Sequence, residues 1–495
     1  MPKAEKKRRR SAEKSPVPGG SPAKENSLAG GNGGQILPVP EETVSFGETA
    51  PAPGETVPAP GETLPVPGET VSFGETVPAP GKTVPAPGET VPAAGERALP
   101  SAKRGEEPAP PPDNTPATDG EKAPATDGGK TPVRRGKRFL GLSRRELLPA
   151  ALFLFSLCLF AAFHLFPAFA AGYNGTVGHF FRRTLAALTN FLPFSLAEIL
   201  LMLLPLFLVL LGFYAARRRC GSWRETGRFL LSVCLALSLF FSFFVFSFAA
   251  GYATPSLRER LSLPKTGVNA ETLEKTARAL AAELENLQYS VDFDESGASV
   301  MPYDTAEMNR LLLSGFSRVS EKYPFIRHFD SRVKPVLFSR LLSYTHITGV
   351  YSYYTGEANL NVFFPDMTLP YTAAHELSHQ RGIAREDEAN FVAFLVCAES
   401  GDAFIRYSGY LELFEYVIDA LYEADPAAFR AVADALPDAV RGDIRAYNAF
   451  FSQFQDAGVA VISDKINSTY IKANGQAAGT ASYSLCVTLA VAYFA

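Results

Sequence analysis

The sequence has few cysteines and few histidines, and both shortages exclude classes of protein. Its 495 residues include five cysteines and six histidines. No two cysteines lie at the short spacings of zinc-finger or redox motifs, so the sequence indicates neither a disulfide scaffold nor a cysteine-based metal site. The five are Cys158, Cys220, Cys234, Cys397 and Cys486.

The chain also lacks a strong excess of charge of either sign. Its formal net charge is -4, and its basic residues do not form a stripe with interleaved aromatic residues. Such a stripe is what tracks a phosphate backbone, so we expect no nucleic-acid partner. With 46% apolar residues, the chain is long enough for more than one folded unit, but its composition differs sharply from segment to segment.

Residues 1–138 form the first segment, which is rich in Pro, Gly, Glu, Thr and Ala. The motif GETVPAP and its variants recur from Gly47 to Gly95 at a spacing of seven residues, broken once by six. A period of seven suggests a coiled coil, but two prolines per repeat forbid the helix. Because the segment cannot bury enough apolar surface to fold, we expect a disordered, partly polyproline-like tail.

Residues 139–251 are expected to form a membrane region. The run from Leu147 to Ala170 holds 24 residues without a formal charge, which is enough to cross a hydrocarbon core of about 30 Å at about 1.5 Å per residue. It begins too far from the N-terminus for a cleaved signal peptide. Further apolar runs cover roughly residues 191–214 and 229–250. The sequence therefore predicts three transmembrane helices in a lipid bilayer.

The charges that flank these runs predict their orientation. Eleven Lys and Arg residues lie before the first run or between the second and third, against five in the opposite flanks. By the positive-inside rule the N-terminus is cytoplasmic, and everything after Ala250 lies outside. We expect a multi-pass protein of the cell membrane with an extracytoplasmic C-terminal domain. The eleven are Arg134, Arg135, Lys137, Arg138, Arg144, Arg145, Arg217, Arg218, Arg219, Arg224 and Arg228, and the five are Arg182, Arg183, Arg258, Arg260 and Lys265.

Residues 252–495 have the size and mixed polarity of a globular domain. Helical patterns begin after Asn269 and after Asp304, where Glu307 is expected to complete a capping box. Both are predicted as early helices of this domain.

Strand and helix patterns follow in the second part of this domain. The stretch ITGVYSYYTGEANLNVFF, residues 347–364, predicts one or two strands, and helical patterns dominate from Leu369 to about Gln455. The final SYSLCVTLAVAYFA is too short to span a bilayer and predicts a packed helix or strand. The fold class is thus mainly α, with three transmembrane helices followed by an α+β domain.

The motif HELSH carries the clearest chemistry in the sequence. His375 and His379 are four residues apart, so on a helix both imidazoles point to one side and can bind one tetrahedral Zn²⁺. Glu376 lies about a third of a turn round the helix, where it can reach a water at the metal's open position without being a ligand. This arrangement predicts a catalytic zinc site.

The flanks of this motif favour two helices joined by a turn. Thr368 is a candidate cap, Pro370 falls in the first turn and Gly382 is a stop signal. A second helix that starts near Arg385 brings its first-turn carboxylates back towards the histidines.

The third ligand is expected among the acids of REDEAN. We favour Glu386, with Glu388 as the competitor and Asp387 as a weaker alternative. Asn390 lies one turn beyond Glu386 on the same face, where it can hydrogen-bond a ligand. In the alternative interpretation, the acids only solvate a helix N-terminus and stabilise its dipole.

These residues resemble the gluzincin class of zinc metallopeptidases, whose pattern is His-Glu-x-x-His followed by Glu-x-x-Ala-Asp. HELSH matches the first motif, Glu386 and Ala389 match the second, and Asn390 replaces the usual Asp. The resemblance implies a zincin-like domain with Zn²⁺ held by the two histidines and Glu386. Metzincins are disfavoured, because Arg385 occupies the position of their third ligand.

A second resemblance covers nearly all of residues 139–495. The three spans followed by GEANLN, AAHELSHQRG and REDEANF resemble an uncharacterised bacterial membrane family, domain of unknown function 3810. That family name implies no substrate.

Other candidate site residues depend on weaker patterns. The stretch GVYSYYTGEANLN, with Glu357 and Asn359, is a candidate edge for pairing with an extended peptide substrate, as its resemblance to the substrate-side strand of gluzincins implies, or else ordinary sheet. Tyr407 and Tyr410 are candidate donors to a tetrahedral oxyanion, with aromatic core as the alternative.

The expected function is zinc-dependent hydrolysis of peptide bonds in a peptide or protein substrate outside the cytoplasm, with Glu376 as general base. An intramembrane protease is disfavoured, because the motif lies more than 100 residues beyond the last span. The alternatives are a non-catalytic membrane receptor or scaffold with a structural zinc, and an amidase that acts on cell-wall material.

The charge bias makes a testable prediction about topology. In intact cells, a cysteine introduced as Lys265→Cys should react with an impermeant maleimide, whereas Ser222→Cys should not, because the two positions lie on opposite sides of the last span. The parent chain supplies the background labelling. The reverse labelling pattern would place the C-terminal domain in the cytoplasm.

Overall fold

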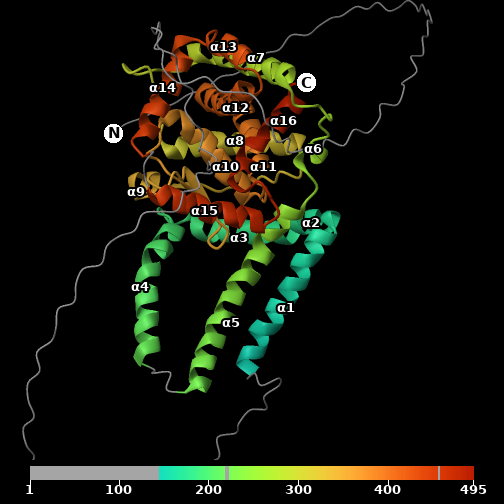
Figure 1. The fold of residues 1–495 in the computed structure, drawn as a ribbon, viewed down its shortest axis with the longest axis vertical. Coiled ribbons are helices and arrows are strands. Elements are labelled where there is room, and N and C mark those ends of the chain that lie inside the picture. The colour runs from blue at the N-terminus through green and yellow to red at the C-terminus, as the bar shows by residue number, and fades with distance from the viewer. Residues whose placement is uncertain (1–143, 218–221, 455–457) are drawn as a thin grey trace, which may run out of the picture. The chain divides into compact units, whose positions relative to one another are not determined.

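The computed structural model of the protein describes residues 144–217, 222–454 and 458–495 (Figure 1). The predicted disordered tail, residues 1–138, lies outside the described residues. The described part of the chain is mainly helical, with a single three-stranded sheet. The mainly helical fold class is therefore confirmed.

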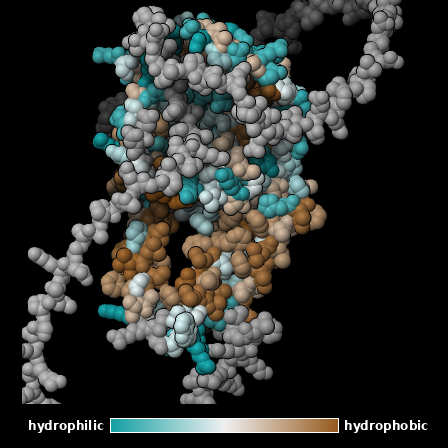
Figure 2. All heavy atoms as spheres, in the orientation of Figure 1, coloured by the Kyte–Doolittle hydropathy of each residue, from teal (hydrophilic) through white to brown (hydrophobic). Residues whose placement is uncertain are grey.

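Three of the described helices are long and apolar enough to cross a membrane, as predicted. They are α1 (Arg144–Leu165), α4 (Leu196–Arg217) and α5 (Trp223–Ser247). Helices α1 and α5 pack together through aromatic pairs such as Phe153 and Phe241, whose ring centroids are 5.7 Å apart. Helix α4 buries none of its residues, and Figure 2 shows hydrophobic side chains gathered over the spans. These faces suit contact with lipid.

The first predicted span is too long at its C-terminal end. The uncharged run extends to Ala170, but α1 ends at Leu165. Pro167 has no backbone N–H and starts a new helix, α2 (Pro167–Tyr173), so the chain changes direction there.

The other two spans begin at different residues than predicted, and a serine caps the start of each. Helix α4 starts at Leu196, where Ser195 Oγ accepts a hydrogen bond of 2.9 Å from the Glu198 N–H. Helix α5 starts at Trp223, where Ser222 Oγ accepts one of 3.4 Å from the Glu225 N–H. Both caps satisfy N–H groups that a helix start leaves free.

The chain between α1 and α4 forms a layer under the rest of the protein. We call residues 167–195 the platform. It comprises α2, the short π-helix η1 (Asn174–Gly178) and α3 (His179–Asn190), which in Figure 1 runs across the domain ends of the spans. The buried Lys334 binds it, with Nζ 2.8 Å from Thr189 O and 3.1 Å from Phe194 O.

The rest of the chain folds into a helical domain around one small sheet. Its elements in chain order are η2 (Ala249–Ala253), α6 (Leu257–Arg260), α7 (Ala270–Leu287), η3 (Gln288–Ser290), α8 (Thr305–Lys322), β1 (Val333–Pro335), α9 (Ser339–Ser343), β2 (Gly349–Ser352), β3 (Glu357–Leu360), η4 (Asp366–Thr368), α10 (Leu369–Gln380), α11 (Glu386–Ala398), α12 (Ala403–Ala424), α13 (Pro426–Ala433), α14 (Asp438–Ser452), α15 (Gly458–Ala473), η5 (Gly479–Leu485) and α16 (Cys486–Tyr493). The C-terminal segment is therefore a helix, and α15 was not predicted.

The hydrophobic core lies between α7, α8, α10, α11 and α12. Helix α7 contributes Leu273, Leu280 and Leu284 from one face, and it packs along α12. Helix α10 is buried along its entire length. A helix that buries every side chain, charged ones included, is unusual and needs a reason beyond packing.

The two predicted early helices are confirmed, but the capping box lies elsewhere. At the start of α7, Asn269 Oδ1 accepts from the Thr272 N–H at 2.9 Å and Thr272 Oγ1 accepts from the Asn269 N–H at 3.0 Å. At the start of α8, Asp304 caps the Glu307 N–H, but the Glu307 carboxylate pairs with Arg310 instead of returning to the cap. The expected box at Glu307 is therefore wrong.

The stretch 347–364 forms two antiparallel strands, β2 and β3. The strand order is β1-β3-β2, with β1 parallel to β3, so β3 is the central strand and β2 an edge. The hairpin turns at Gly356, whose φ is +72°. A Cβ there would lie 2.6 Å from Leu185 Cβ, so only glycine lets the hairpin rest on the platform.

A buried ion pair joins the sheet to both the platform and a span. Lys334 and Glu357 pair with side chains 3% and 0% exposed. Glu357 also accepts from the backbone N–H groups of Leu196 and Ala197 at 3.0 and 2.8 Å, so it caps α4. The sheet therefore sets where the second span begins.

We predict that Lys334→Met lowers the free energy of unfolding by about 3–5 kcal/mol, since it leaves a buried carboxylate without its cation. The double variant Lys334→Met/Glu357→Gln should lose less than Lys334→Met alone. Chemical unfolding of the full chain in detergent, followed by circular dichroism, measures both. Lys265→Met, at an exposed lysine, is the control. Equal losses in the single and double variants would contradict the pairing.

Candidate metal centre

The centre is built on two helices joined by a tight turn. Helix α10 ends at Gln380, the chain turns at Gly382 with φ +93°, and α11 begins at Glu386. Thr368 does not cap α10 as expected, because its hydroxyl donates to Pro365 O at 2.9 Å. The helix instead continues directly from the 3₁₀ turn η4.

The turn brings His375, His379 and Glu386 together. The two Nε2 atoms are 2.9 Å apart, and Glu386 Oε2 lies 3.2 Å from His379 Nε2 and 3.3 Å from His375 Nε2. Within the described residues, these three form the one group of metal-ligating side chains with all ligand atoms close together.

This triangle fits a tetrahedral zinc ion. With ligand distances of about 2.0–2.1 Å, tetrahedral zinc separates its ligand atoms by about 3.3–3.4 Å, close to the separations seen here. Two imidazole nitrogens and one carboxylate oxygen are also the donor set of catalytic zinc sites, which leave a fourth position open. The residues present therefore fit the metal that the sequence predicts.

A hydrogen bond holds the His379 imidazole with Nε2 directed at the centre, whereas His375 Nδ1 has no hydrogen-bond partner among the described residues. His379 Nδ1 lies 2.7 Å from Ile383 O, and because a carbonyl only accepts, Nδ1 is the donor and Nε2 faces Glu386 and His375. Asn390 lies beside the His375 side chain and donates to Tyr416 Oη and Tyr483 O at 3.2 and 3.1 Å. Asn390 thus lies where a residue that orients a ligand is expected.

The protonation of the cluster follows from burial and from Glu386. Burial and the neighbouring His379 lower the pKa of His375. Burial acts against the charged form of His379, but Glu386 outweighs it and raises the pKa of His379 to about 9. Burial likewise acts to raise the pKa of Glu386, but the two histidines hold it below its ordinary value. Glu386 is therefore an ionised oxygen donor at neutral pH.

Glu376 lies beside the cluster but is not part of it. Burial raises the pKa of its carboxyl to about 8, and the carboxylate accepts a hydrogen bond from the Tyr351 backbone in the edge strand β2. Its Oε2 atom has no hydrogen-bond partner among the described residues. A Cβ on Gly349 would lie 2.7 Å from its Oε1, so only glycine leaves room for it. An unpaired buried oxygen needs an explanation, and a proton-transfer role supplies one.

The rival acids of α11 have other partners. Glu388 Oε1 accepts from the Leu257 N–H at 2.7 Å and from Arg385 at 2.6 Å. Asp387 accepts from Gln476 Nε2 at 3.0 Å. Both carboxylates point away from the histidines, and only Glu386 reaches them.

The expected substrate strand requires correction. Glu357 and Asn359 lie in β3, which has a neighbour on each side and offers no free edge. Glu357 caps α4, and Asn359 Nδ2 donates to Val350 O at 3.0 Å. The edge strand is β2, which the sequence pattern did not distinguish from β3.

The candidate oxyanion donors also belong to the core. Tyr407 is fully buried and donates to Asp443 Oδ2 at 2.7 Å, and Tyr410 packs edge-on against Phe394 at 5.3 Å. A tyrosine that the sequence did not indicate lies at the cluster instead. Tyr483 stacks on His375 with ring centroids 6.2 Å apart and hydrogen-bonds Glu386. It lies more than 90 residues beyond Glu386, so no local pattern marks it.

The platform supports the turn between the two metal helices. Asn174 Nδ2 donates to Gly382 O at 2.9 Å. The buried Arg182 donates to Asn174 O at 2.8 Å and to Ser247 O, at the end of α5, at 2.9 Å. A Cβ on Gly382 would collide with the Arg182 guanidinium. Residues before the third span thus complete the site.

The cluster lies next to the end of a membrane span. Phe248, the residue after α5, lies edge-on to His379 with ring centroids 6.2 Å apart. It also stacks on Tyr353 at 5.6 Å. Although more than 100 residues separate the motif from the end of α5 in the sequence, the two therefore lie close together in space.

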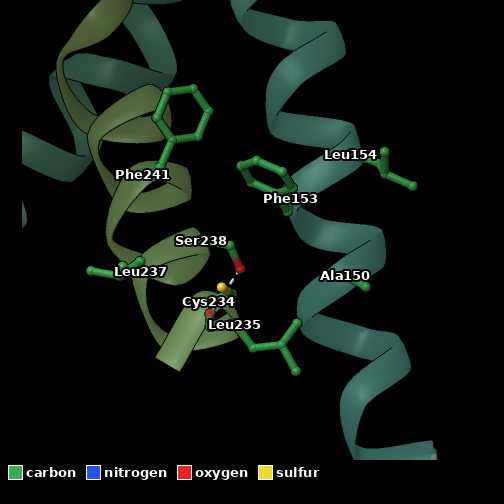
Figure 3. Close-up of a pocket in the computed structure, with 8 residues that line it drawn as sticks. All are labelled: Ala150, Phe153, Leu154, Cys234, Leu235, Leu237, Ser238 and Phe241. Carbon is green, nitrogen blue, oxygen red and sulfur yellow. Dashed lines mark hydrogen bonds between the residues drawn. The ribbon is translucent and has the colours of Figure 1, made fainter. Parts of the chain in front are cut away.

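A cavity of about 630 Å³ lies elsewhere, between α1 and α5 (Figure 3). Its lining is apolar apart from Cys234 and Ser238, and the Ser238 hydroxyl donates to Leu235 O at 2.7 Å. It lies along two of the apolar helices, and its lining holds no carboxylate or imidazole. Its size alone therefore does not make it the functional site.

Comparison with known proteins identifies a family but no activity. A family model described as "Protein of unknown function (DUF3810)" matches residues 173–491. The match begins in the platform and includes α4, α5 and the whole helical domain up to α16. Neither curated proteins nor solved structures give a significant match.

The ligand set can be tested by measuring bound metal. In the full chain purified in detergent, Glu386→Gln should weaken zinc binding by more than about 100-fold, because loss of a residue that only orients a ligand already costs about 10–100-fold. Glu388→Gln should keep the metal, since its side chain binds Arg385 and a backbone N–H. Elemental analysis and competition with a chelating dye measure this. The opposite ranking of the two variants would assign the ligand to Glu388.

Proposed function

Since the chain belongs to the family described as "Protein of unknown function (DUF3810)", which assigns no activity, we propose its function from the geometry of the site. The protein is a membrane-anchored zinc peptidase that hydrolyses peptide bonds outside the cytoplasm. The observation that carries the proposal is the convergence of His375, His379 and Glu386 beside a buried carboxylate, Glu376, with one oxygen unpartnered.

The side chains of the centre have different roles in the proposed reaction. Zinc, when bound, supplies a Lewis acid that lowers the pKa of a water and polarises a carbonyl. His375, His379 and Glu386 would hold it. Glu376 accepts the proton of the attacking water and delivers it to the leaving amine, and its raised pKa of about 8 suits both transfers near neutral pH.

The edge strand is placed to orient a substrate. Strand β2 pairs with β3 on one side only, and the Tyr351 backbone on it already contacts the Glu376 carboxylate. A peptide that adds to this edge in extended form runs past Glu376 and the cluster. Such pairing recognises the peptide backbone through main-chain hydrogen bonds. Specificity then comes from pockets that receive alternate side chains of the peptide.

The arrangement favours catalysis over a structural metal. A structural zinc site closes its coordination with a fourth protein ligand, but the group found among the described residues has three. A structural site also has no use for Glu376, whose burial costs stability without a pairing partner. Hydrolysis of an amide in cell-wall material would use the same chemistry. A peptidase and a cell-wall amidase are therefore distinguished by their substrates.

The location outside the cytoplasm is supported by the charge bias of the flanks. The domain ends of α1, α4 and α5 lie on the same side in Figure 1, next to the platform. Three helices long enough to cross and a cytoplasmic N-terminus, inferred from the flanking charges, support a centre on the outer side.

The role of Glu376 is tested by Glu376→Gln. The amide cannot accept a proton, so turnover should fall by about 10²–10⁴-fold while zinc content and folding are retained. Turnover is followed by mass spectrometry of a mixed peptide library and of cell-wall fragments incubated with the full chain. Glu423→Gln, at an exposed position of α12, is the control. Undiminished turnover in Glu376→Gln would refute the mechanism, and activity on cell-wall fragments alone would make the protein an amidase.

A further inference from the structure

Helix α15 has one face against the metal centre and one face without a protein partner. Four large apolar side chains on the second face are exposed: Val459 by 46%, Val461 by 71%, Ile462 by 61% and Ile466 by 67%. Lys465 and Lys472 lie on the same exposed side. Apolar side chains flanked by lysines are typical of helices that lie in the surface of a lipid layer.

The inner face of α15 covers the centre. Tyr470 Oη lies 3.3 Å from Tyr252 Oη, and Asn467 Nδ2 donates to Tyr483 Oη at 3.4 Å. Tyr483 in turn hydrogen-bonds Glu386. Helix α15 is thus separated from the metal ligands by one layer of side chains.

The same helix lies at the level where a span ends. The Tyr470 ring contacts Phe244, in the last turn of α5, with centroids 6.4 Å apart. Figure 1 shows α15 in the layer of the domain next to the spans, together with α3 and α9. Helix α15 therefore lies beside the domain end of α5.

Helix α9 and the residues just before it also expose apolar side chains, in this case beside α4. Leu337 and Leu341 are 81% and 67% exposed. The backbone N–H groups of Leu337 and Phe338 donate to the Glu198 carboxylate in the first turn of α4, both at 2.9 Å. Exposed apolar residues on both helices thus gather at the ends of spans, where lipid is the nearest apolar phase.

We propose that α15 and α9 lie in the outer surface of the lipid bilayer, and that the centre acts on peptide segments at that surface, next to a membrane anchor. The substrate part rests on the proposed peptidase function. An extended chain advances about 3.3 Å per residue, so a segment of about ten residues beside an anchor has a reach of about 33 Å, enough to bring it to a centre next to the spans.

Tethering supplies the energetic reason for this substrate class. A segment held at the bilayer surface meets the centre at an effective concentration in the millimolar range, without any added contact. The aromatic residues around the centre, which include Phe248, Tyr252 and Tyr353, have the amphipathic character that the membrane interface favours.

The membrane position of α15 is tested without any assay of activity. In a Trp223→Phe background, which removes the single native tryptophan, Ile462→Trp in liposomes should show blue-shifted emission that brominated lipids quench and acrylamide does not. Tyr289→Trp, 82% exposed at the end of α7, is the matched control and should respond only to acrylamide. Acrylamide quenching of Ile462→Trp equal to that of the control would overturn the proposal.

The substrate class is tested by mapping new protein N-termini in envelope fractions of cells with the wild-type chain or Glu376→Gln. Cleavages that depend on Glu376 should lie within about ten residues of the outer end of a span or a lipid anchor, a reach of about 33 Å. Dependent cleavages spread through soluble proteins would overturn the inference and leave the peptidase function standing. No dependent cleavage at all would instead remove the peptidase function and, with it, the inferred substrate class.

Discussion

The turn at Gly382 is the constraint on which the centre depends. Only six residues separate His379 from Glu386, and the chain must reverse within them to return a carboxylate to the histidines. The positive φ of Gly382 makes this reversal, and Ile383 O, one residue later, orients the His379 ring. A side chain at Gly382 would be strained and would collide with Arg182. The same turn therefore sets the position of one ligand and the tautomer of another.

This turn is supported by the buried Arg182, whose guanidinium has no acid partner among the described residues. Burial lowers the pKa of Arg182 to about 10, and its guanidinium donates to backbone carbonyls. One of these, Ser247 O, ends a membrane helix, where unsatisfied carbonyls carry partial negative charge. The end of α5 thus supplies part of the electrostatic support for the turn between α10 and α11.

Local features of the fold and site could be predicted from the sequence because they depend on neighbours a few residues away. Three apolar runs gave three spans, Asn269 and Asp304 began helices, and the spacing of HELSH and REDEAN indicated which side chains meet. Span boundaries shifted where Pro167 or a serine cap overrode hydropathy.

Features that depend on distant parts of the chain could not be predicted. The pattern of a strand does not show which neighbours it has, so Glu357 was read as part of a substrate edge when it caps a span. Tyr407 and Tyr483 look alike in sequence, yet one binds Asp443 in the core and the other lies on His375. Helix α15 also had no recognised signal, because its apolar residues face outwards.

The bond between Asn174 and Gly382 joins residues 208 positions apart, and this has a consequence for biogenesis. The platform is synthesised and inserted with the spans long before α10 leaves the ribosome. The turn at Gly382 is stabilised only when the platform and the end of α5 have already folded. A chain in which the platform and α5 have not yet folded therefore lacks the contacts that hold the turn at Gly382.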